Sequence, residues 1–238
     1  MFQIILTYFL WNSVFADTNT EVFGYNREKI LTYVFGIIII RALVFSARSV
    51  DIPGEIADGK LSNYLIRPIN YFKYWLTRDL SSKALNLAFS ISEFIILAII
   101  LKPPLFFQSN LLYILLFLII LLLANYLIFV IRMIVSFVTF WMPELAWGAQ
   151  FIFMMIITEF LSGAVFPLDI FPDTWQKTIN LTPFPYLVFF PLQVYLGQIT
   201  IVESMQGIMV ALFWSLILSI IMKKIWLSGL KIYSSEGR

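Results

Sequence analysis

The sequence contains no cysteine and no histidine. Their absence excludes disulfides, thiolate nucleophiles, imidazole bases and the zinc sites that depend on these side chains. Charge is also scarce, since Asp, Glu, Lys and Arg make up 13% of the 238 residues and the formal net charge is +2. So small a charge gives no reason to expect a polyanionic partner. The composition therefore argues against most familiar enzyme chemistries and against nucleic-acid binding.

Long apolar runs are what the sequence has in excess. Hydrophobic residues make up 61% of the chain and gather in runs too long for a soluble core. Because a membrane-crossing helix needs roughly 20 apolar residues, the chain has room for about six crossings. We predict an all-α polytopic membrane protein with one transmembrane domain over residues 1–238. The expected crossings lie near 1–16, 30–47, 84–101, 111–140, 146–162 and 205–222.

The distribution of Lys and Arg predicts the orientation of these crossings. Basic residues collect in the segment 46–83 and in the tail after residue 222, and positively charged loops stay in the cytoplasm. Both termini are therefore expected to be cytoplasmic. Residues 1–16 lack the basic segment of a signal peptide, so we interpret them as a short first crossing.

Four ionisable residues fall inside the expected crossings, where a charge costs at least ~2.5 kcal/mol. Arg41 and Arg132 lie toward cytoplasmic ends and are expected to snorkel to the interface. Glu93 lies near the middle of its crossing, so its short side chain must pair or take up a proton. Arg41 is within reach of it on the neighbouring crossing, and both a structural ion pair and a transport pathway remain open. Glu159 is a weaker candidate of the same kind.

The segment 46–83 is the largest expected cytoplasmic loop. Its apolar and charged residues interleave, which favours short amphipathic helices that face the bilayer on one side and a cytosolic partner on the other. An interfacial helix with no partner is the alternative. The segment is punctuated by turn formers and helix breakers, which are Pro53, Gly54, Gly59 and Pro68.

The run from Glu55 to Pro68 resembles the signature E-I-x-x-G-x-L-x-x-x-L-x-x-P of ABC-2 type permeases. In that family this stretch lies between the second and third crossings and contains the coupling helix that docks on the nucleotide-binding subunit. The resemblance implies an ATPase-coupling role for the following residues: Pro53, Gly54, Glu55, Ile56, Gly59, Leu61, Leu65, Arg67 and Pro68.

The proline-rich segment 163–200 is similar to the region between the fifth and sixth crossings of such permeases, where short re-entrant or external helices cover the outer mouth. We expect a gate there, formed by Gly163, Pro167, Pro172, Pro183 and Pro185; alternatively, these prolines only break helices at a wet surface.

The chain looks closest to the small viologen-exporter-like permeases, which commonly pair two different subunits. Family members usually begin with a basic amphipathic helix, so we expect that this element precedes residue 1 or has been lost.

No phosphate-binding loop of the form G-x-x-x-x-G-K-[ST] occurs in the sequence. The resemblance therefore implies a permease subunit of an ATP-driven exporter in a bacterial-type cytoplasmic membrane. Its expected cargo is hydrophobic or amphipathic, for example a drug-like or cationic molecule. Its expected partners are membrane lipid, a second permease, preferably a different subunit, and an ABC ATPase dimer that carries ATP and Mg²⁺. We expect no metal or cofactor on this chain.

Two other functions stay open at this point. An ATP-independent transporter or channel would use Glu93 as its coupling site, although the sequence shows none of the internal repeats that many secondary transporters have. A membrane-embedded enzyme is disfavoured because the chain has no His, no Cys and no clustered acidic metal motif.

Overall fold

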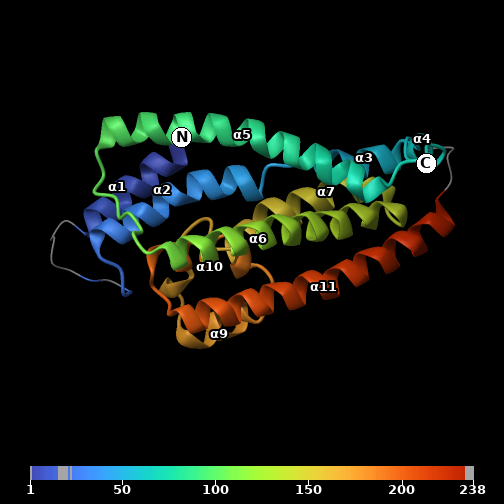
Figure 1. Cartoon of the computed structure of the whole chain (residues 1–238). Coiled ribbons are helices and arrows are strands. Elements are labelled where there is room, and N and C mark those ends of the chain that lie inside the picture. The colour runs from blue at the N-terminus through green and yellow to red at the C-terminus, as the bar shows by residue number, and fades with distance from the viewer. Residues whose placement is uncertain (1, 16–20, 22, 234–238) are drawn as a thin grey trace.

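The computed structural model describes residues 2–15, 21 and 23–233, and this part of the chain is all-helical, without a strand. The long helices lie side by side in an elongated bundle, with α5 along one edge, α11 along the other and α6 between them (Figure 1). The all-α class predicted from the sequence is confirmed. The principal helices are α1 (Phe2–Val14), α2 (Arg27–Val44), α5 (Tyr71–Leu101), α6 (Leu111–Phe137) and α11 (Ile201–Ile232).

Three described helices are long and apolar enough to cross a membrane: α5, α11, and α6 together with its 3₁₀ extension Val138–Phe140. A fourth candidate joins α2 to the helical segment Ser49–Ala57 across a bend of 60°. Helix α1 and the segment Trp147–Leu161 are apolar but shorter. The chain is thus a multi-pass membrane protein, and the full set of six crossings stays a prediction.

Helix α5 begins at Tyr71, well before the expected start at residue 84. The Asn70 side chain caps it by accepting a hydrogen bond from the Lys73 backbone N–H at 3.0 Å, which satisfies one of the unpaired donors of the first turn. Its first turns carry Asp79 and Lys83, which are buried. The boundary expected at residue 84 was wrong because these charges suggested a wet loop.

Helix α11 also exceeds its predicted range of 205–222. It starts at Ile201 behind a capping box, in which Thr200 and Glu203 each bond to the other's backbone. It continues past Lys223 and Lys224 to Ile232. Lysine is a good helix former, so a basic pair marks where a helix leaves the apolar layer without ending it.

The predicted fifth crossing at 146–162 is a broken element. It comprises α7 (Ala146–Gln150), a π-helix over Phe151–Thr158 and α8 (Glu159–Leu161). The wider turn is visible in the hydrogen bond from Thr158 Oγ1 to the Phe153 carbonyl, five residues earlier. π-Helical turns are uncommon and frequently occur at functional sites.

Beyond α8 the chain continues alongside α2 without regular helix. Gly163 has a φ of +81°, and its carbonyl accepts a hydrogen bond from Tyr33 Oη at 2.7 Å. Further on, Asp169 accepts one from Tyr25 Oη at 2.7 Å. This segment is therefore fixed by hydrogen bonds from α2 and from the residues just before it.

Short helices follow, at the end of the bundle opposite α3 and α4 (Figure 1). Helix α10 packs against α6 and α2, and its first residue, Phe189, donates its backbone N–H to the Ser162 carbonyl. This segment therefore folds back into the bundle. Its elements are the 3₁₀ turns Leu168–Ile170 and Pro185–Leu187, α9 (Asp173–Asn180) and α10 (Phe189–Leu196).

Two apolar clusters hold the helices together. The larger one lies where α2, α6 and α10 meet. The second, here called the coupling-end cluster, joins the short helices α3 (Ile52–Ala57) and α4 (Ser62–Leu65) to α5, α6 and α11. Its central side chains are Ile52, Ile56, Leu61, Trp75, Phe137, Phe140 and Trp226.

Gly229 lets α11 approach this coupling-end cluster. A Cβ atom built at Gly229 would overlap the ring of Phe140, whereas one built at Gly148 would meet nothing within 4 Å. We expect Gly229→Ala to lower the free energy of unfolding by about 1–3 kcal/mol through overpacking. The matched Gly148→Ala variant should be neutral or slightly stabilising. Thermal unfolding of both purified variants checks this, and equal melting temperatures would contradict it.

Candidate functional site

The predicted ATPase-coupling residues divide into a buried scaffold and an exposed surface. Ile56 and Leu61 are buried in the coupling-end cluster, and Pro53 at the start of α3 is also buried. Gly59 adopts a φ of +74°, and its carbonyl accepts hydrogen bonds from Ser62 and from Tyr233 at the end of α11. These residues shape and anchor the α3–α4 element.

Two further motif residues contribute to the same scaffold. Glu55 accepts a hydrogen bond from Tyr64 Oη at 3.0 Å and is only half-exposed. A Cβ at Gly54 would contact the ring of Trp147 at 3.2 Å, so Gly54 allows α3 to approach α7. Changes at either position would alter the element itself as well as its surface.

The exposed half of the motif forms a continuous strip, here called the docking strip, over residues 65–70. Leu65, Arg67 and Pro68 are all exposed, and Ile66 is 82% exposed. Next to the strip, Lys60 and Asp58 form an ion pair at 2.7 Å that raises the pKa of Lys60. Arg67 is therefore the charge that the strip itself presents.

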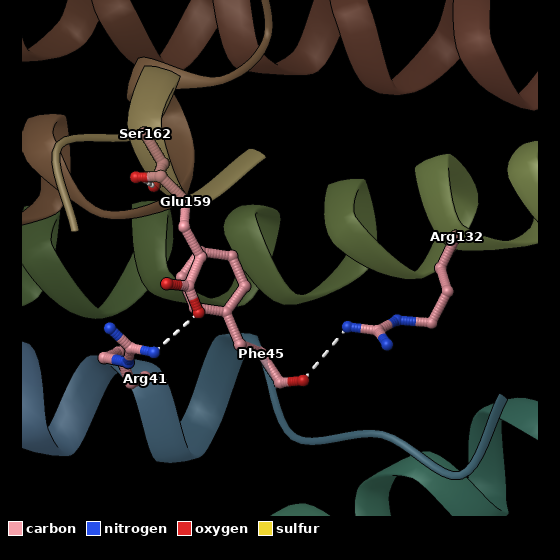
Figure 2. Close-up of polar contacts among 5 residues, drawn as sticks. All are labelled: Arg41, Phe45, Arg132, Glu159 and Ser162. Carbon is pink, nitrogen blue, oxygen red and sulfur yellow. Dashed lines mark hydrogen bonds and ion pairs between the residues drawn. The ribbon is translucent and has the colours of Figure 1, made fainter. Parts of the chain in front are cut away.

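Arg41 and Glu159 form an ion pair between α2 and α8 (Figure 2), with Nη2 and Oε1 2.6 Å apart. Their side chains are 30% and 20% exposed. Arg41 thus has a partner on the broken fifth element, 118 residues away, and its predicted pairing with Glu93 stays a prediction. Because Glu159 reaches Arg41, Arg41 does not need to snorkel.

Glu93 nevertheless lines the same polar cavity as Arg41. This cavity, of about 330 Å³, lies between α1, α2 and α5. Ser90 and Asn86, one and two turns of α5 earlier, also line it, as does Ser46 just after the end of α2. Two of the three predicted intramembrane residues, Arg41 and Glu93, therefore line one cavity. The third, Glu159, forms an ion pair with Arg41.

Arg132 does not snorkel, and that prediction was wrong. Its side chain is 6% exposed, and Nη2 donates to the Phe45 carbonyl at 3.0 Å (Figure 2). Phe45 is the C-cap of α2, whose terminal carbonyls have no partner within the helix. Arg132 therefore caps a neighbouring helix inside the protein.

The predicted gate residues lie mostly inside the outer segment. Gly163, Pro167, Pro183 and Pro185 are buried, and only Pro172 is exposed, at the start of α9. Sequence reasoning missed the polar contact that fixes this segment, in which the buried Gln193 donates to Asp169 at 2.6 Å. The gate itself stays a prediction.

Sequence reasoning also missed a polar stripe along α5. Asp79, Lys83, Asn86, Ser90 and Glu93 follow one another at intervals of four and three residues, which places them on one helix face. That face packs against α2. The spacing was present in the sequence, but assigning Asp79 and Lys83 to a loop concealed it.

The comparisons with known proteins agree with this architecture. The model of a family described as ABC-2 family transporter protein matches residues 1–237. Neither the curated proteins nor the solved structures gave a match. Since the family model covers nearly every residue, the chain belongs to the ABC-2 transporter family.

Proposed function

We propose that this chain is the membrane-spanning permease subunit of an ATP-driven exporter, and that the docking strip binds a separate ABC ATPase subunit. Family membership supports the permease role. The observation that carries the proposal is the docking strip: its apolar side chains are not covered by protein, on an element whose other face is anchored in the coupling-end cluster. ATP and Mg²⁺ would bind to the partner subunit, and both termini would lie on its side of the membrane.

The strip has the composition of a protein contact. Ile66 and Leu65 offer apolar anchors, and Arg67 adds a directional charge, which together resemble the centre and rim of an interface. The α3–α4 element that carries the strip is held by the Tyr233–Gly59 hydrogen bond and by the buried Ile56 and Leu61. A movement of the strip would therefore displace the helices that contact this element, which are α5, α6 and α11.

The polar cavity supports a path for the cargo. It places Arg41 and Glu93 together inside the bundle, where isolated charges are costly and commonly mark transport pathways. With Glu159 included, the three ionisable groups carry one positive and two negative formal charges. This balance favours a cargo with an amphipathic and cationic character. A second permease, preferably a different subunit, would complete the path.

Co-purification tests the proposal. The tagged chain, expressed with its neighbouring genes and extracted in mild detergent, should retain a stoichiometric ABC ATPase. Ile66→Asp should reduce the retained ATPase by about 30-fold, since loss of an interface anchor costs at least 2 kcal/mol. The matched control Trp175→Asp changes an exposed aromatic residue on α9 at the opposite end, and it should retain the ATPase fully.

Two results would count against the proposal. If the unmodified chain carries no ATPase, the ATP-driven exporter is rejected, and a transporter coupled at Glu93 becomes the better account. If Ile66→Asp retains the ATPase as well as Trp175→Asp does, the docking strip is not the contact.

A further inference from the structure

Three buried charged side chains meet where α2 ends and the α3–α4 element begins. Asp79 and Lys83 come from α5 and Arg132 from α6, and their side chains are 1%, 4% and 6% exposed. Charged residues are almost never this deeply buried unless they are paired or hydrogen-bonded. The hydrogen-bond partners of Asp79, Lys83 and Arg132 therefore show which parts of the backbone these side chains bind.

The two cations cap the end of α2. Lys83 Nζ donates to the carbonyls of Leu43 at 2.5 Å and Val44 at 2.8 Å, and Arg132 donates to that of Phe45. The carbonyls at a helix C-terminus lack intrahelical partners and carry the negative end of the helix dipole. Lys83 and Arg132 thus bind α2 by three consecutive backbone groups.

Asp79 holds the beginning of the next element. Its Oδ1 accepts the backbone N–H groups of Arg48 and Ser49, both at 2.7 Å, and its Oδ2 accepts Ser49 Oγ at 2.7 Å. Ser49 opens the short 3₁₀ turn that leads directly into α3. Asp79 and Lys83, one turn apart on α5, therefore form hydrogen bonds on both sides of the 60° bend between α2 and the α3 segment.

The same site reaches the element that carries Glu159. Gln150 at the end of α7 donates to Ser136 Oγ at 2.6 Å and to the Arg132 carbonyl at 3.2 Å. Arg41 lies one turn before the capped Phe45, whose backbone N–H bonds to the Arg41 carbonyl. Arg41 and Glu159 thus lie on two elements that both form hydrogen bonds with Arg132, one to its side chain and one to its backbone.

We propose that Asp79, Lys83 and Arg132 form a clamp that transmits movement of the α3–α4 element to α2, and through α2 to the Arg41–Glu159 pair. The inference rests on the proposed function, because an ATPase must supply the movement. These are positioning residues because they bond to the backbone on both sides of a bend. Asp79 and Lys83 also begin the polar stripe of α5 that leads to the cavity. Without the clamp, the four residues 45–48 would let the bend flex.

A pair of labels tests the clamp, and the absence of native cysteine restricts each label to its introduced site. Asn63→Cys places a fluorescent probe on α4, and Glu28→Cys places one on the far end of α2; both side chains are exposed. In the complex with the ATPase, a non-hydrolysable ATP analogue should change both signals. In Lys83→Met, the Asn63 response should persist while the Glu28 response falls by about tenfold, the size of a typical coupling term.

Further variants separate transmission from folding. Ser49→Ala removes one hydrogen bond to Asp79 and keeps all three charges, so it should fold and show a smaller loss of the same kind. Lys83→Arg keeps the cation and should restore most of the Glu28 response. Thr77→Ala, at an exposed position on α5, is the control and should behave as the parent.

The outcomes distinguish the two proposals. If the parent holds no ATPase, the proposed function fails and the clamp fails with it. If the parent holds the ATPase and Glu28 responds equally in Lys83→Met and Ser49→Ala, the clamp alone is rejected. If the Lys83→Met chain does not fold, an unchanged Glu28 response in Ser49→Ala rejects the clamp and a reduced one supports it.

Discussion

The variants Arg41→Gln and Glu159→Gln should each lower the melting temperature of the purified protein by on the order of 10 °C, from a loss of about 3 kcal/mol. Each removes one half of an ion pair that is formed at 2.6 Å between α2 and α8. The remaining charge then lies inside the bundle without its partner. The double variant, which removes both charges of the pair, should recover most of the lost stability.

The exposed pair Lys60–Asp58 provides the matched control for this experiment. The side chains of Lys60 and Asp58 are 60% and 56% exposed, against 30% and 20% for Arg41 and Glu159. Exposed ion pairs contribute at most about 1 kcal/mol to the free energy of unfolding. Lys60→Gln should therefore leave the melting temperature nearly unchanged. Equal effects at Lys60 and Arg41, or a double variant as unstable as the sum of the two single variants, would contradict an energetically coupled internal pair.

Cargo transport by the double variant separates a structural pair from a pathway residue. We expect the stable, neutral double variant to remain impaired in transport, since Arg41 lines the polar cavity. The measurement is ATP-dependent dye accumulation in inverted membrane vesicles. Full transport by the double variant would assign the pair a structural role only.

Trp226→Ala should have a comparably large effect, with a loss of about 3–5 kcal/mol. Trp226 on α11 stacks on Tyr71 of α5 at 4.6 Å between ring centroids and contacts Phe137 and Phe140 as well. One side chain thus joins α5, α6 and α11 at the base of the α3–α4 element. We expect the variant to unfold at a lower temperature and to retain less ATPase, because the scaffold of the docking strip is loosened.

Trp175→Ala is the control for this prediction. Trp175 is 63% exposed on α9, and surface substitutions usually change stability by no more than about 0.5 kcal/mol. Thermal unfolding and ATPase co-purification should be measured on both variants. A Trp226→Ala protein that matches Trp175→Ala in both measurements would show that the aromatic contacts do not support the coupling end.

The helix best predicted from the sequence is α6. Its predicted range of 111–140 agrees with Leu111–Phe137 and the 3₁₀ turn that follows, because a long and strongly apolar run favours a membrane-spanning helix. The start of α5 could not be read in the same way. Asp79 and Lys83 look like loop residues until their partners, 30 to 40 residues earlier in the chain, are known.

The candidate site was predictable in its residues and not in its pairings. Arg41, Glu93 and Glu159 stand out because charge is rare in apolar runs, yet helical spacing says nothing of which distant element carries the partner. The broken fifth element brings Glu159 to Arg41, and no local pattern predicts a π-helix there. The motif at 53–68 likewise identifies a functional element, but burial alone separates its anchoring residues from its exposed ones.

Cross-linking from the docking strip tests the central claim most directly. Ile66→Cys introduces a single thiol at a position of the strip whose native side chain is 82% exposed, and Trp175→Cys introduces one at the opposite end of the bundle. With a short thiol-reactive photo-cross-linker in membranes, position 66 should form a covalent adduct with an ABC ATPase and position 175 should form none. An absence of ATPase adducts from position 66, in membranes that contain the ATPase, would contradict the account.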